Sequence, residues 1–265
     1  RAGLLGLPVR HSLSPRLHRA AGKACGISVD YRLGEVSGDE VLGRMTDWRA
    51  QGLHGFNLTA PHKAAGASWV DRLDPVAARV GVVNTVVCGP TETVGYNTDV
   101  QGFAETLGDP PDRVVILGAG GAIRAVVVAL LERGVRRIEL VNRSEERARL
   151  LADALAPDHI SIHSLDAIDR RLVGTELVIN GLPAAANAWV VTQPFEVMAP
   201  HGRVMDLGYG QRVEPVRRAV TVAGRHYQDG IEMLARQGVA AFTLWTGRTP
   251  PLSTVLDALS SEVVD

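Results

Sequence analysis

The stretch that decides the fold reads Arg113-Val114-Val115-Ile116-Leu117-Gly118-Ala119-Gly120-Gly121-Ala122. Its first half is a continuous apolar run, which is typical of a strand buried on both faces. Its second half is a glycine-rich turn, and a helical pattern follows to about Glu132. Glycines let the backbone approach a pyrophosphate, whose charge the helix N-terminus stabilises. The order strand, turn, helix predicts a dinucleotide site at Gly118, Ala119, Gly120, Gly121 and Ala122.

One position of this fingerprint is unusual. The third glycine position holds Ile123, where the usual pattern has glycine or alanine. We therefore expect a different packing of the helix against the strand. The alternative interpretation of the whole segment is a tight turn that binds no ligand.

The end of the next predicted strand indicates which nucleotide is bound. NAD sites usually carry an acidic residue there, which bonds the ribose 2′-hydroxyl. Glu139 has the approximate spacing but lies in mid-strand, so we do not assign it that role. An arginine can pair with a 2′-phosphate, and a serine hydroxyl can add to that contact. The pattern favours NADP over NAD, with contacts expected from Asn142, Arg143, Ser144 and Arg147. The alternative is that Arg143 is a solvated surface residue.

Strands and helices alternate along the chain, which predicts an α/β fold with a mostly parallel, doubly wound sheet of the Rossmann type. Gly108-Asp109-Pro110-Pro111 is the clearest boundary signal. We expect a substrate-binding α/β domain over residues 1–107 and an NADP-binding domain over residues 108–230. Helical patterns over residues 231–244 and 250–262 lie in a C-terminal segment, 231–265, that is expected to pack back on the first domain.

Individual elements follow from local patterns. Strands are predicted over residues 2–7, 29–34, 53–57, 82–88, 93–96, 113–117, 137–141, 177–180, 204–207 and 225–228. Helix starts are predicted at Ser14, which precedes Pro15, at the capping box of residues 37–40, at Thr98 or Asp99, and at Ser144.

Two polar clusters follow predicted strands. They read Asn57-Leu58-Thr59-Ala60-Pro61-His62-Lys63 and Asn97-Thr98-Asp99. Pro61 suits the first turn of a helix, so the first cluster is interpreted as a strand-to-helix turn. A lysine and an aspartate at two such turns are what proton transfer to a small polyol requires.

Four further residues are candidate substrate contacts. Ser12 and Ser14 place two hydroxyls before a helix, where free N–H groups can bind a carboxylate; the alternative for Ser14 is an N-cap alone. Asn84 lies within an apolar strand pattern and Gln237 within an apolar helix pattern. Each needs a partner, which is either a neighbouring backbone group or a substrate hydroxyl.

The composition argues against several classes of protein. The net charge is −1 and there is no basic stripe, so no nucleic-acid partner is expected. No apolar run approaches the ~18 residues of a membrane helix, and no signal peptide is recognised. Two cysteines, Cys25 and Cys88, indicate a reducing cytoplasm rather than a disulfide framework. We expect no metal site, a monomer or homodimer, and a native start upstream of Arg1.

Taken together, these motifs resemble the shikimate dehydrogenase family, which reversibly reduces 3-dehydroshikimate to shikimate with NADPH in aromatic amino-acid (chorismate) biosynthesis. They are Ser12-Leu13-Ser14, the Asn57 and Asn97 clusters, Val83-Asn84-Thr85, Gly118 to Ala122, Asn142-Arg143-Ser144 and Gln237-Gly238, in family order. The resemblance implies that Lys63 and Asp99 are catalytic and that His62 is structural. It implies substrate contacts from Ser12, Ser14, Thr59, Asn84, Gln237 and Tyr209. It further implies that Leu207 and Gly230 lie on the nicotinamide side.

The chain departs from the family pattern at three places, all on the cofactor side. Ile123 is one, Gly181-Leu182-Pro183 after Asn180 is the second, and Gln211 in place of a proline is the third. Two alternatives stay open. One is a quinate/shikimate dehydrogenase that uses NAD. The other is a non-catalytic protein that binds a shikimate-type ligand on the same fold.

Overall fold

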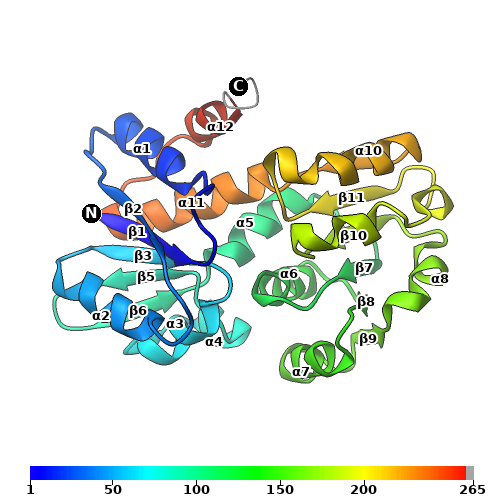
Figure 1. The fold of residues 1–265 in the computed structure, drawn as a ribbon, viewed down its shortest axis with the longest axis horizontal. Helices are drawn as coiled ribbons and strands as arrows, with labels where there is room; N and C mark the ends of the chain where they lie inside the picture. Colours follow the sequence, from blue (N-terminus) through cyan, green and yellow to red (C-terminus); the bar gives the residue numbers. More distant parts are fainter. Residues whose placement is uncertain (261–265) are drawn as a thin grey trace. The chain divides into compact units, whose positions relative to one another are not determined.

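The structure is a computed structural model that describes residues 1–260. The chain forms two compact units (Figure 1). The first comprises Arg1–Glu105 together with the C-terminal segment from Glu232 onward, and the second comprises Thr106–Ile231. The predicted helix over residues 250–262 ends outside the described residues, as does the last part of the 231–265 segment.

The first unit is built on a six-stranded sheet with the order β2-β1-β3-β5-β6-β4. Its strands are β1 (Ala2–Gly6), β2 (Tyr31–Glu35), β3 (Gly55–Leu58), β4 (Arg72–Leu73), β5 (Thr85–Cys88) and β6 (Thr93–Tyr96). β1 is parallel to β2 and β3, whereas β5 is antiparallel to both β3 and β6. The carboxyl ends of β1 and β3 therefore lie at one edge of the sheet.

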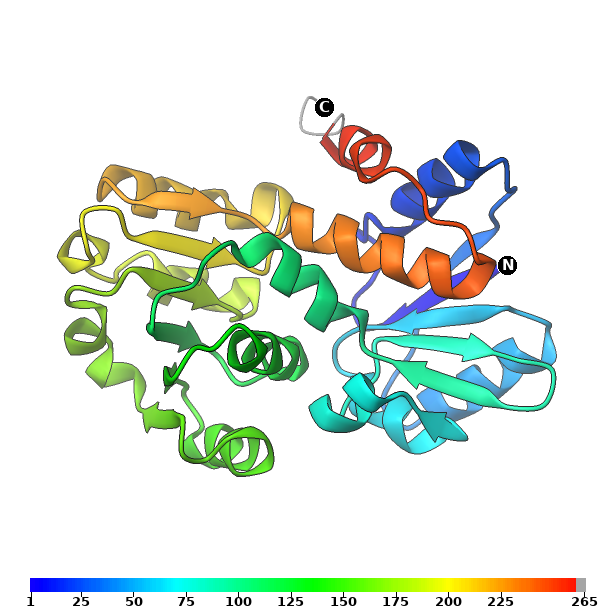
Figure 2. The ribbon, with the colours of Figure 1, turned by 180° about the vertical axis from the view of Figure 1, so that it is seen from behind.

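Helices cover both faces of this sheet. They are α1 (Ser14–Cys25), α2 (Val41–Ala50), α3 (Lys63–Trp69), α4 (Pro75–Val80), α5 (Thr98–Leu107), α11 (Ile231–Thr246) and α12 (Leu252–Ser260). Leu5 packs in one core cluster with Trp48 of α2, whereas Leu4 packs in another with Trp245 of α11. Successive strand residues point to opposite faces, so α2 and α11 cover opposite faces. The C-terminal helices are seen in Figure 2, where α12 packs beside α1.

The second unit holds a six-stranded sheet in which every pair is parallel. Its order is β12-β11-β10-β7-β8-β9, the doubly wound order in which the first strand lies beside the fourth. The strands are β7 (Arg113–Leu117), β8 (Arg137–Val141), β9 (Ile160–His163), β10 (Leu177–Asn180), β11 (Arg203–Asp206) and β12 (His226–Gln228). The connection reverses between β7 and β10, so this pair marks the switch point where such sheets bind nucleotides.

The helices of the second unit are α6 (Gly121–Glu132), α7 (Glu145–Leu155), α8 (Ile168–Leu172), α9 (Asn187–Val190) and α10 (Glu214–Val222). Short 3-10 turns are η1 (Leu165–Ala167), η2 (Ala184–Ala186), η3 (Phe195–Val197) and η4 (Gly210–Val213). Residues of α8, α9 and α10 share one core cluster with β7, β10 and β11. α6 packs against α7. The sheet is thus covered by two groups of helices.

The sequence predicted most of these elements. The strands at 93–96, 113–117, 137–141 and 177–180 have the predicted bounds, and the other predicted strands differ by one to three residues at an end. β4 and β9 were not predicted, because β4 has only two residues and β9 shows the alternation of a strand over only four. The prediction that Ser14 caps α1 is wrong: the N-cap is Leu13, and Ser14 is the first helical residue.

Candidate active site

Lys63 stands at the start of α3, where the chain leaves β3. The intervening residues form the predicted strand-to-helix turn, but Pro61 precedes the helix and does not lie in its first turn, so that detail of the prediction is wrong. The buried ring of His62 holds the turn, since its Nε2 lies 2.8 Å from the carbonyl oxygen of Val36. His62 therefore fills a structural position beside Lys63.

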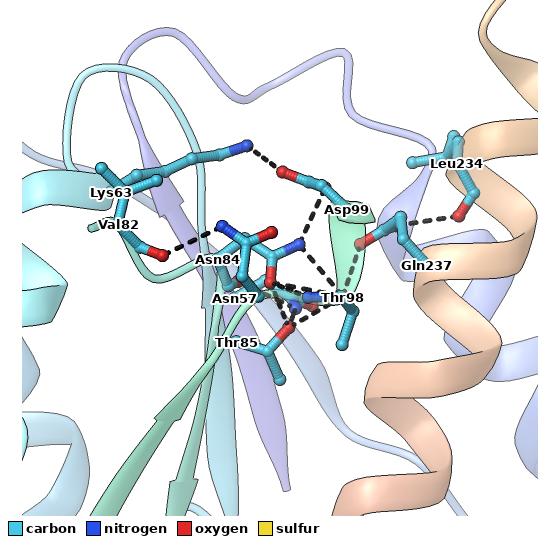
Figure 3. A network of polar contacts seen from close by, with 10 residues as sticks. Asn57, Lys63, Val82, Asn84, Thr85, Thr98, Asp99, Leu234 and Gln237 are labelled. Atoms are coloured by element: carbon cyan, nitrogen blue, oxygen red, sulfur yellow. Dashed lines mark hydrogen bonds and ion pairs between the residues drawn. The ribbon is translucent and has the colours of Figure 1, made fainter. Parts of the chain in front are cut away.

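Lys63 and Asp99 form a close ion pair (Figure 3). Lys63 Nζ donates to Asp99 Oδ2 at 2.5 Å, and the side chains are 13% and 9% exposed. Asp99 lies in the first turn of α5, where the helix dipole favours a carboxylate. A lysine ammonium has three donors, so Lys63 can serve a substrate oxygen while it remains bonded to Asp99.

Asn84 fixes the other side of Asp99. Its amide Nδ2 donates to Asp99 Oδ1 at 2.8 Å and to Thr98 Oγ1 at 3.0 Å. Its Oδ1 accepts from the backbone N–H of Thr98 at 2.8 Å and from Thr85 Oγ1 at 3.0 Å. The sequence had suggested that Asn84 lies within a strand. That detail is wrong, because Asn84 directly precedes β5. Of its two expected partners, the backbone group is present, the N–H of Thr98; its other partners are the side chains of Thr85, Thr98 and Asp99.

Asn57 is hydrogen-bonded to residues of this network. It accepts from the phenol of Tyr31 at 2.7 Å and donates to Thr85 Oγ1 at 2.9 Å and to the carbonyl of Asn84 at 3.2 Å. All these side chains are buried. Buried polar groups that are fully bonded have one orientation, so the bonds of Asn57 help fix the amide of Asn84.

Gln237 reaches the network from α11. Its Oε1 accepts from Thr98 Oγ1 at 3.5 Å, and its Nε2 donates to the carbonyl of Leu234 at 2.8 Å. Gly102 of α5 permits this approach, since a Cβ there would lie 2.8 Å from Cβ of Gln237. The missing side chain at Gly102 therefore lets α5 and α11 come close enough for Gln237 to reach Thr98.

Ser12 and Ser14 lie in the loop after β1. Ser12 Oγ donates to Ser14 Oγ at 3.0 Å and accepts the backbone N–H of Ser14 at 3.2 Å. This loop and the one after β3 share the same edge of the sheet, because Leu7 N–H donates to the carbonyl of Ala60 and Thr59 N–H donates to that of Leu5, each at 3.0 Å. This edge of the sheet thus carries the hydroxyl groups of Ser12 and Ser14, the side chain of Thr59, and the turn that leads to Lys63.

A buried aromatic cluster lies behind this edge. The ring of His18 stacks on Tyr31 at 4.4 Å and approaches Trp245 at 5.1 Å, measured between ring centroids. Complete burial lowers the pKa of His18 to about 3, so His18 is neutral near pH 7. His18 is therefore part of the core that carries Tyr31, the partner of Asn57.

The glycine turn of the second unit has the features of a pyrophosphate site. Gly118 has a φ of +105°, which strongly favours glycine. Gly120 is the N-cap of α6, has no side-chain cap, and has open space where a Cβ would stand. The N-terminus of a twelve-residue helix therefore faces an accessible turn, which fits a diphosphate.

The predicted ribose-phosphate contacts gather at the carboxyl end of β8. Asn142 Nδ2 donates to the carbonyl of Ser144 at 2.7 Å, and Ser144 caps α7 by accepting the N–H of Arg147 at 3.3 Å. Arg143 and Arg147 are exposed. Two guanidinium groups at the start of a helix fit a dianionic phosphate, so these residues fit a 2′-phosphorylated dinucleotide.

Glu139 is engaged in the interior of the sheet. Its carboxylate lies 2.6 Å from Arg113 Nε and 3.3 Å from Arg171 Nη1. Burial by itself would raise the pKa of Glu139, but hydrogen bonds and charges of Arg113 and Arg171 outweigh it and hold the pKa below its usual range. Glu139 is thus paired with arginines within the protein.

Bonded loops follow β10 and β11, the strands whose ends precede the predicted nicotinamide contacts. Asp206 accepts from Asn180 Nδ2 at 2.9 Å and from the N–H of Gly208 at 2.8 Å, and Gly230 N–H donates to the carbonyl of Gly208 at 2.8 Å. Burial raises the pKa of Asp206. Leu207 and Tyr209 flank Gly208 and are partly buried. The backbone of Gly208, between these two residues, is thereby bonded to both Asp206 and Gly230.

Sequence reasoning missed several supporting residues. Three were not recognised: Thr85 bonds to the predicted Asn84, Tyr31 bonds to Asn57, and Asp206 bonds to Asn180 and Gly208 beside the predicted Leu207. Thr85 directly follows Asn84, and that adjacency was a usable signal. Tyr31 meets Asn57 only because β1 lies between β2 and β3, so no local pattern could identify it.

The described part of the chain lacks two further kinds of feature. Residues 1–260 contain no cluster of three or more His, Cys, Asp or Glu side chains that could hold a metal ion. Over the same range, no helix combines the length and the apolar character that crossing a membrane requires.

Comparison with known proteins agrees with this geometry. Residues 4–86, 105–223 and 230–259 match the sequence families described as "Shikimate dehydrogenase substrate binding domain", "Shikimate / quinate 5-dehydrogenase" and "Shikimate 5'-dehydrogenase C-terminal domain". A relative from Moorella thermoacetica, "Shikimate dehydrogenase (NADP(+))", is 39% identical and is covered over 98% of this chain and 92% of its own length.

Solved structures share the whole fold. The shikimate 5-dehydrogenase of Thermus thermophilus, in complex with NADP(H) and shikimate, is 34% identical with a TM-score of 0.84 and covers 97% of each chain. The quinate dehydrogenase of Corynebacterium glutamicum, in complex with NAD, is 27% identical with a TM-score of 0.84 and covers 98% of each chain. The resemblance inferred from the motifs is confirmed by these similarities over nearly the full length: the chain belongs to the shikimate dehydrogenase family.

Proposed function

We propose that this protein is a shikimate dehydrogenase that reversibly reduces 3-dehydroshikimate to shikimate with NADPH, a step of chorismate and aromatic amino-acid biosynthesis. The observation that carries the proposal is the Lys63–Asp99 pair, whose carboxylate is also bonded by Asn84. A protein that only bound its ligand would not need a proton donor held in this way.

The substrate is a cyclic hydroxy acid, and the first unit offers a partner for each kind of group on it. The hydroxyls of Ser12 and Ser14, beside the first turn of α1, bind the carboxylate. The family resemblance also implies a substrate contact from the phenol of Tyr209. Thr59, Asn84, Asp99 and Gln237 bind the ring hydroxyls, since they carry both donors and acceptors.

When bound, NADPH supplies the hydride. Lys63 stabilises the negative charge that develops on the carbonyl oxygen and then donates a proton from Nζ to that oxygen. Asp99 keeps the ammonium pointed at the substrate and accepts a bond from the neighbouring hydroxyl. In the oxidation of shikimate, Lys63 takes the proton back.

The cofactor is held by the second unit. Gly118, Ala119, Gly120, Gly121 and Ala122 cradle the pyrophosphate, and Asn142, Arg143, Ser144 and Arg147 hold the 2′-phosphate. Leu207 and Gly230 border the nicotinamide. The division of labour follows the predicted domains, with residues 1–107 and 231–265 binding substrate and residues 108–230 binding NADP.

An absorbance assay at the nicotinamide band tests the proposal. Shikimate or quinate is offered with NADP or NAD, in all four combinations. We expect turnover mainly with shikimate and NADP. Turnover mainly with quinate and NAD would establish the alternative enzyme, and shikimate binding without turnover would establish a ligand-binding protein.

We further propose a cytoplasmic location and a monomeric or dimeric state. Both cysteines are free thiols in the structure, which suits a reducing compartment. Subcellular fractionation and light scattering of the purified protein test these two points. Recovery of the protein in an oxidising compartment, or of a larger assembly, would contradict them.

A further inference from the structure

Ile123 is a large residue at a position where dinucleotide-binding turns usually have a small one. In the dinucleotide fingerprint the third glycine allows the helix to pack closely on its strand. Here Ile123 occupies that place in the first turn of α6, and its side chain is fully buried. A four-carbon side chain therefore fills space that the usual fingerprint leaves to a hydrogen atom or a methyl group.

The side chain of Ile123 occupies the space beside Gly181, which directly follows β10. A Cβ built on Gly181 would lie 2.3 Å from Cδ1 and 2.7 Å from Cγ1 of Ile123. Gly181 is not among the glycines with positive φ, so its backbone conformation suits any residue. The side chain of Ile123 is therefore what requires glycine at position 181.

The glycine turn after β7 and the turn after β10 are in direct contact. Gly181 N–H donates to the carbonyl of Leu117 at 2.9 Å. A Cβ on Gly118 would lie 3.2 Å from the carbonyl carbon and oxygen of Gly181. Leu117 ends β7 and Gly181 follows β10, so the contact lies at the switch point of the sheet. The glycine turn and the turn after β10 are thus in close contact at Gly118 and Gly181.

Hydrogen bonds continue from this point to the nicotinamide side. Leu182 N–H donates to Asn180 Oδ1 at 3.2 Å, and Asn180 in turn donates to Asp206. Asp206 holds Gly208, whose carbonyl accepts from Gly230. A shift of the turn after β10 would therefore reach the loops assigned to the nicotinamide.

We propose that Ile123 and Gly181 form one positioning pair for the dinucleotide. The usual fingerprint places the small residue on the helix. Here the small residue is Gly181, directly after β10, and the large one is Ile123 on α6. The pair sets the spacing between the pyrophosphate turn and the nicotinamide loops. This role rests on the proposed NADP site.

A double-mutant cycle on NADPH binding tests the pair. The Kd is measured by the fluorescence of bound nicotinamide for the wild type, Gly181→Ala, Ile123→Ala and the double variant. We expect Gly181→Ala to raise the Kd about tenfold, because overpacking a filled site displaces its neighbours. Ile123→Ala should raise it several-fold. The double variant should return to within about threefold of the wild type, because contacting residues are not additive.

Controls separate positioning from loss of stability. Ile138→Ala makes the same truncation near the amino end of β8, where Ile138 is equally buried; it should lower Tm while the Kd for NADPH stays near wild type. The Kd for shikimate should be unchanged in every variant. If Gly181→Ala does not fold, the double variant with Ile123→Ala, which removes both Cδ1 and Cγ1, should restore folding and NADPH binding.

The outcomes are distinct. Single effects that multiply in the double variant, or a wild-type Kd in Gly181→Ala, overturn the positioning pair while the proposed function stands. A wild-type protein that does not bind NADPH overturns the proposed function, and the pair's role falls with it.

Discussion

Asn84 Nδ2 donates to Asp99 Oδ1 at 2.8 Å, and this bond joins the residue before β5 to the first turn of α5. The second oxygen of the same carboxylate is bonded by Lys63. Both oxygens of Asp99 are thereby oriented by the protein itself. Asn84 thus positions the carboxylate that orients the proton donor, in addition to its proposed contact with substrate.

Replacing Asn84 with Asp changes the charge with little change in shape. Two carboxylates would then face each other at hydrogen-bond distance, and one of them would retain a proton to higher pH. We expect kcat/KM at pH 7 to fall at least about tenfold, and the pH–rate profile to gain an ionisation. Steady-state assays from pH 5 to pH 9 check this. A wild-type profile would show that Asn84 does not set the charge state of the pair.

Replacing Lys63 with Ala removes the proposed proton donor. We expect kcat to fall by roughly 10²- to 10⁴-fold, the usual contribution of general acid–base catalysis, with a smaller change in the Kd for shikimate. The matched control is Lys23→Ala, since Lys23 is exposed and is the other lysine of the chain. Near-normal kcat in Lys63→Ala would remove Lys63 from the chemistry.

Arg143→Ala tests the choice of cofactor. Loss of a guanidinium that pairs with the 2′-phosphate should raise KM for NADPH by about ten- to a hundredfold, with KM for NADH little changed. Arg149→Ala, an exposed arginine further along α7, serves as the control. Equal effects of Arg143→Ala on both cofactors would indicate a surface arginine without a role in selectivity.

The buried His18 predicts a pH dependence of stability. Its pKa falls from 6.5, the value expected in the unfolded chain, to about 3 in the folded protein, because burial disfavours the charged form. Below pH 6.5 the unfolded chain takes up a proton that the folded protein excludes until about pH 3. The free energy of unfolding should therefore fall as pH falls through this window, by at most about 1.4 kcal/mol per pH unit from this group.

Urea unfolding at several pH values measures this slope. His18→Gln should flatten it between about pH 6 and pH 4, whereas His201→Gln, at an exposed position, should keep the wild-type slope. An unchanged slope in His18→Gln would show that another group controls stability in this range.

Glu139→Gln tests the buried ion pairs of the second unit. The change leaves Arg113 and Arg171 without their anion, and we expect the free energy of unfolding to fall by about 2–3 kcal/mol, less than for a fully buried pair because both arginines are partly exposed. The Kd for NADPH should be nearly unchanged. Glu176→Gln, at an exposed position in the same unit, is the control. A selective loss of NADPH binding would instead make Glu139 a cofactor residue.

The parallel sheet of the second unit was the most predictable part of the fold. β7 and β10 have their predicted bounds, because strands buried on both faces tend to be continuous apolar runs. The cap of α7 by Ser144 was also predictable, since a cap depends on residues only three positions apart. Pro61 and Ser14 were misplaced, because whether the helix starts one or two residues later is decided by bonds such as that from His62 to Val36.

The sequence by itself determined the family and the residue types of the site, because the motifs stand in order along the chain and their chemistry is local to each. Only the tertiary structure decided which of them meet. The Lys63–Asp99 contact, the Tyr31–Asn57 bond and the Ile123–Gly181 packing each join segments far apart in sequence. Strand order and close packing create such contacts, and neither property is written in any single segment.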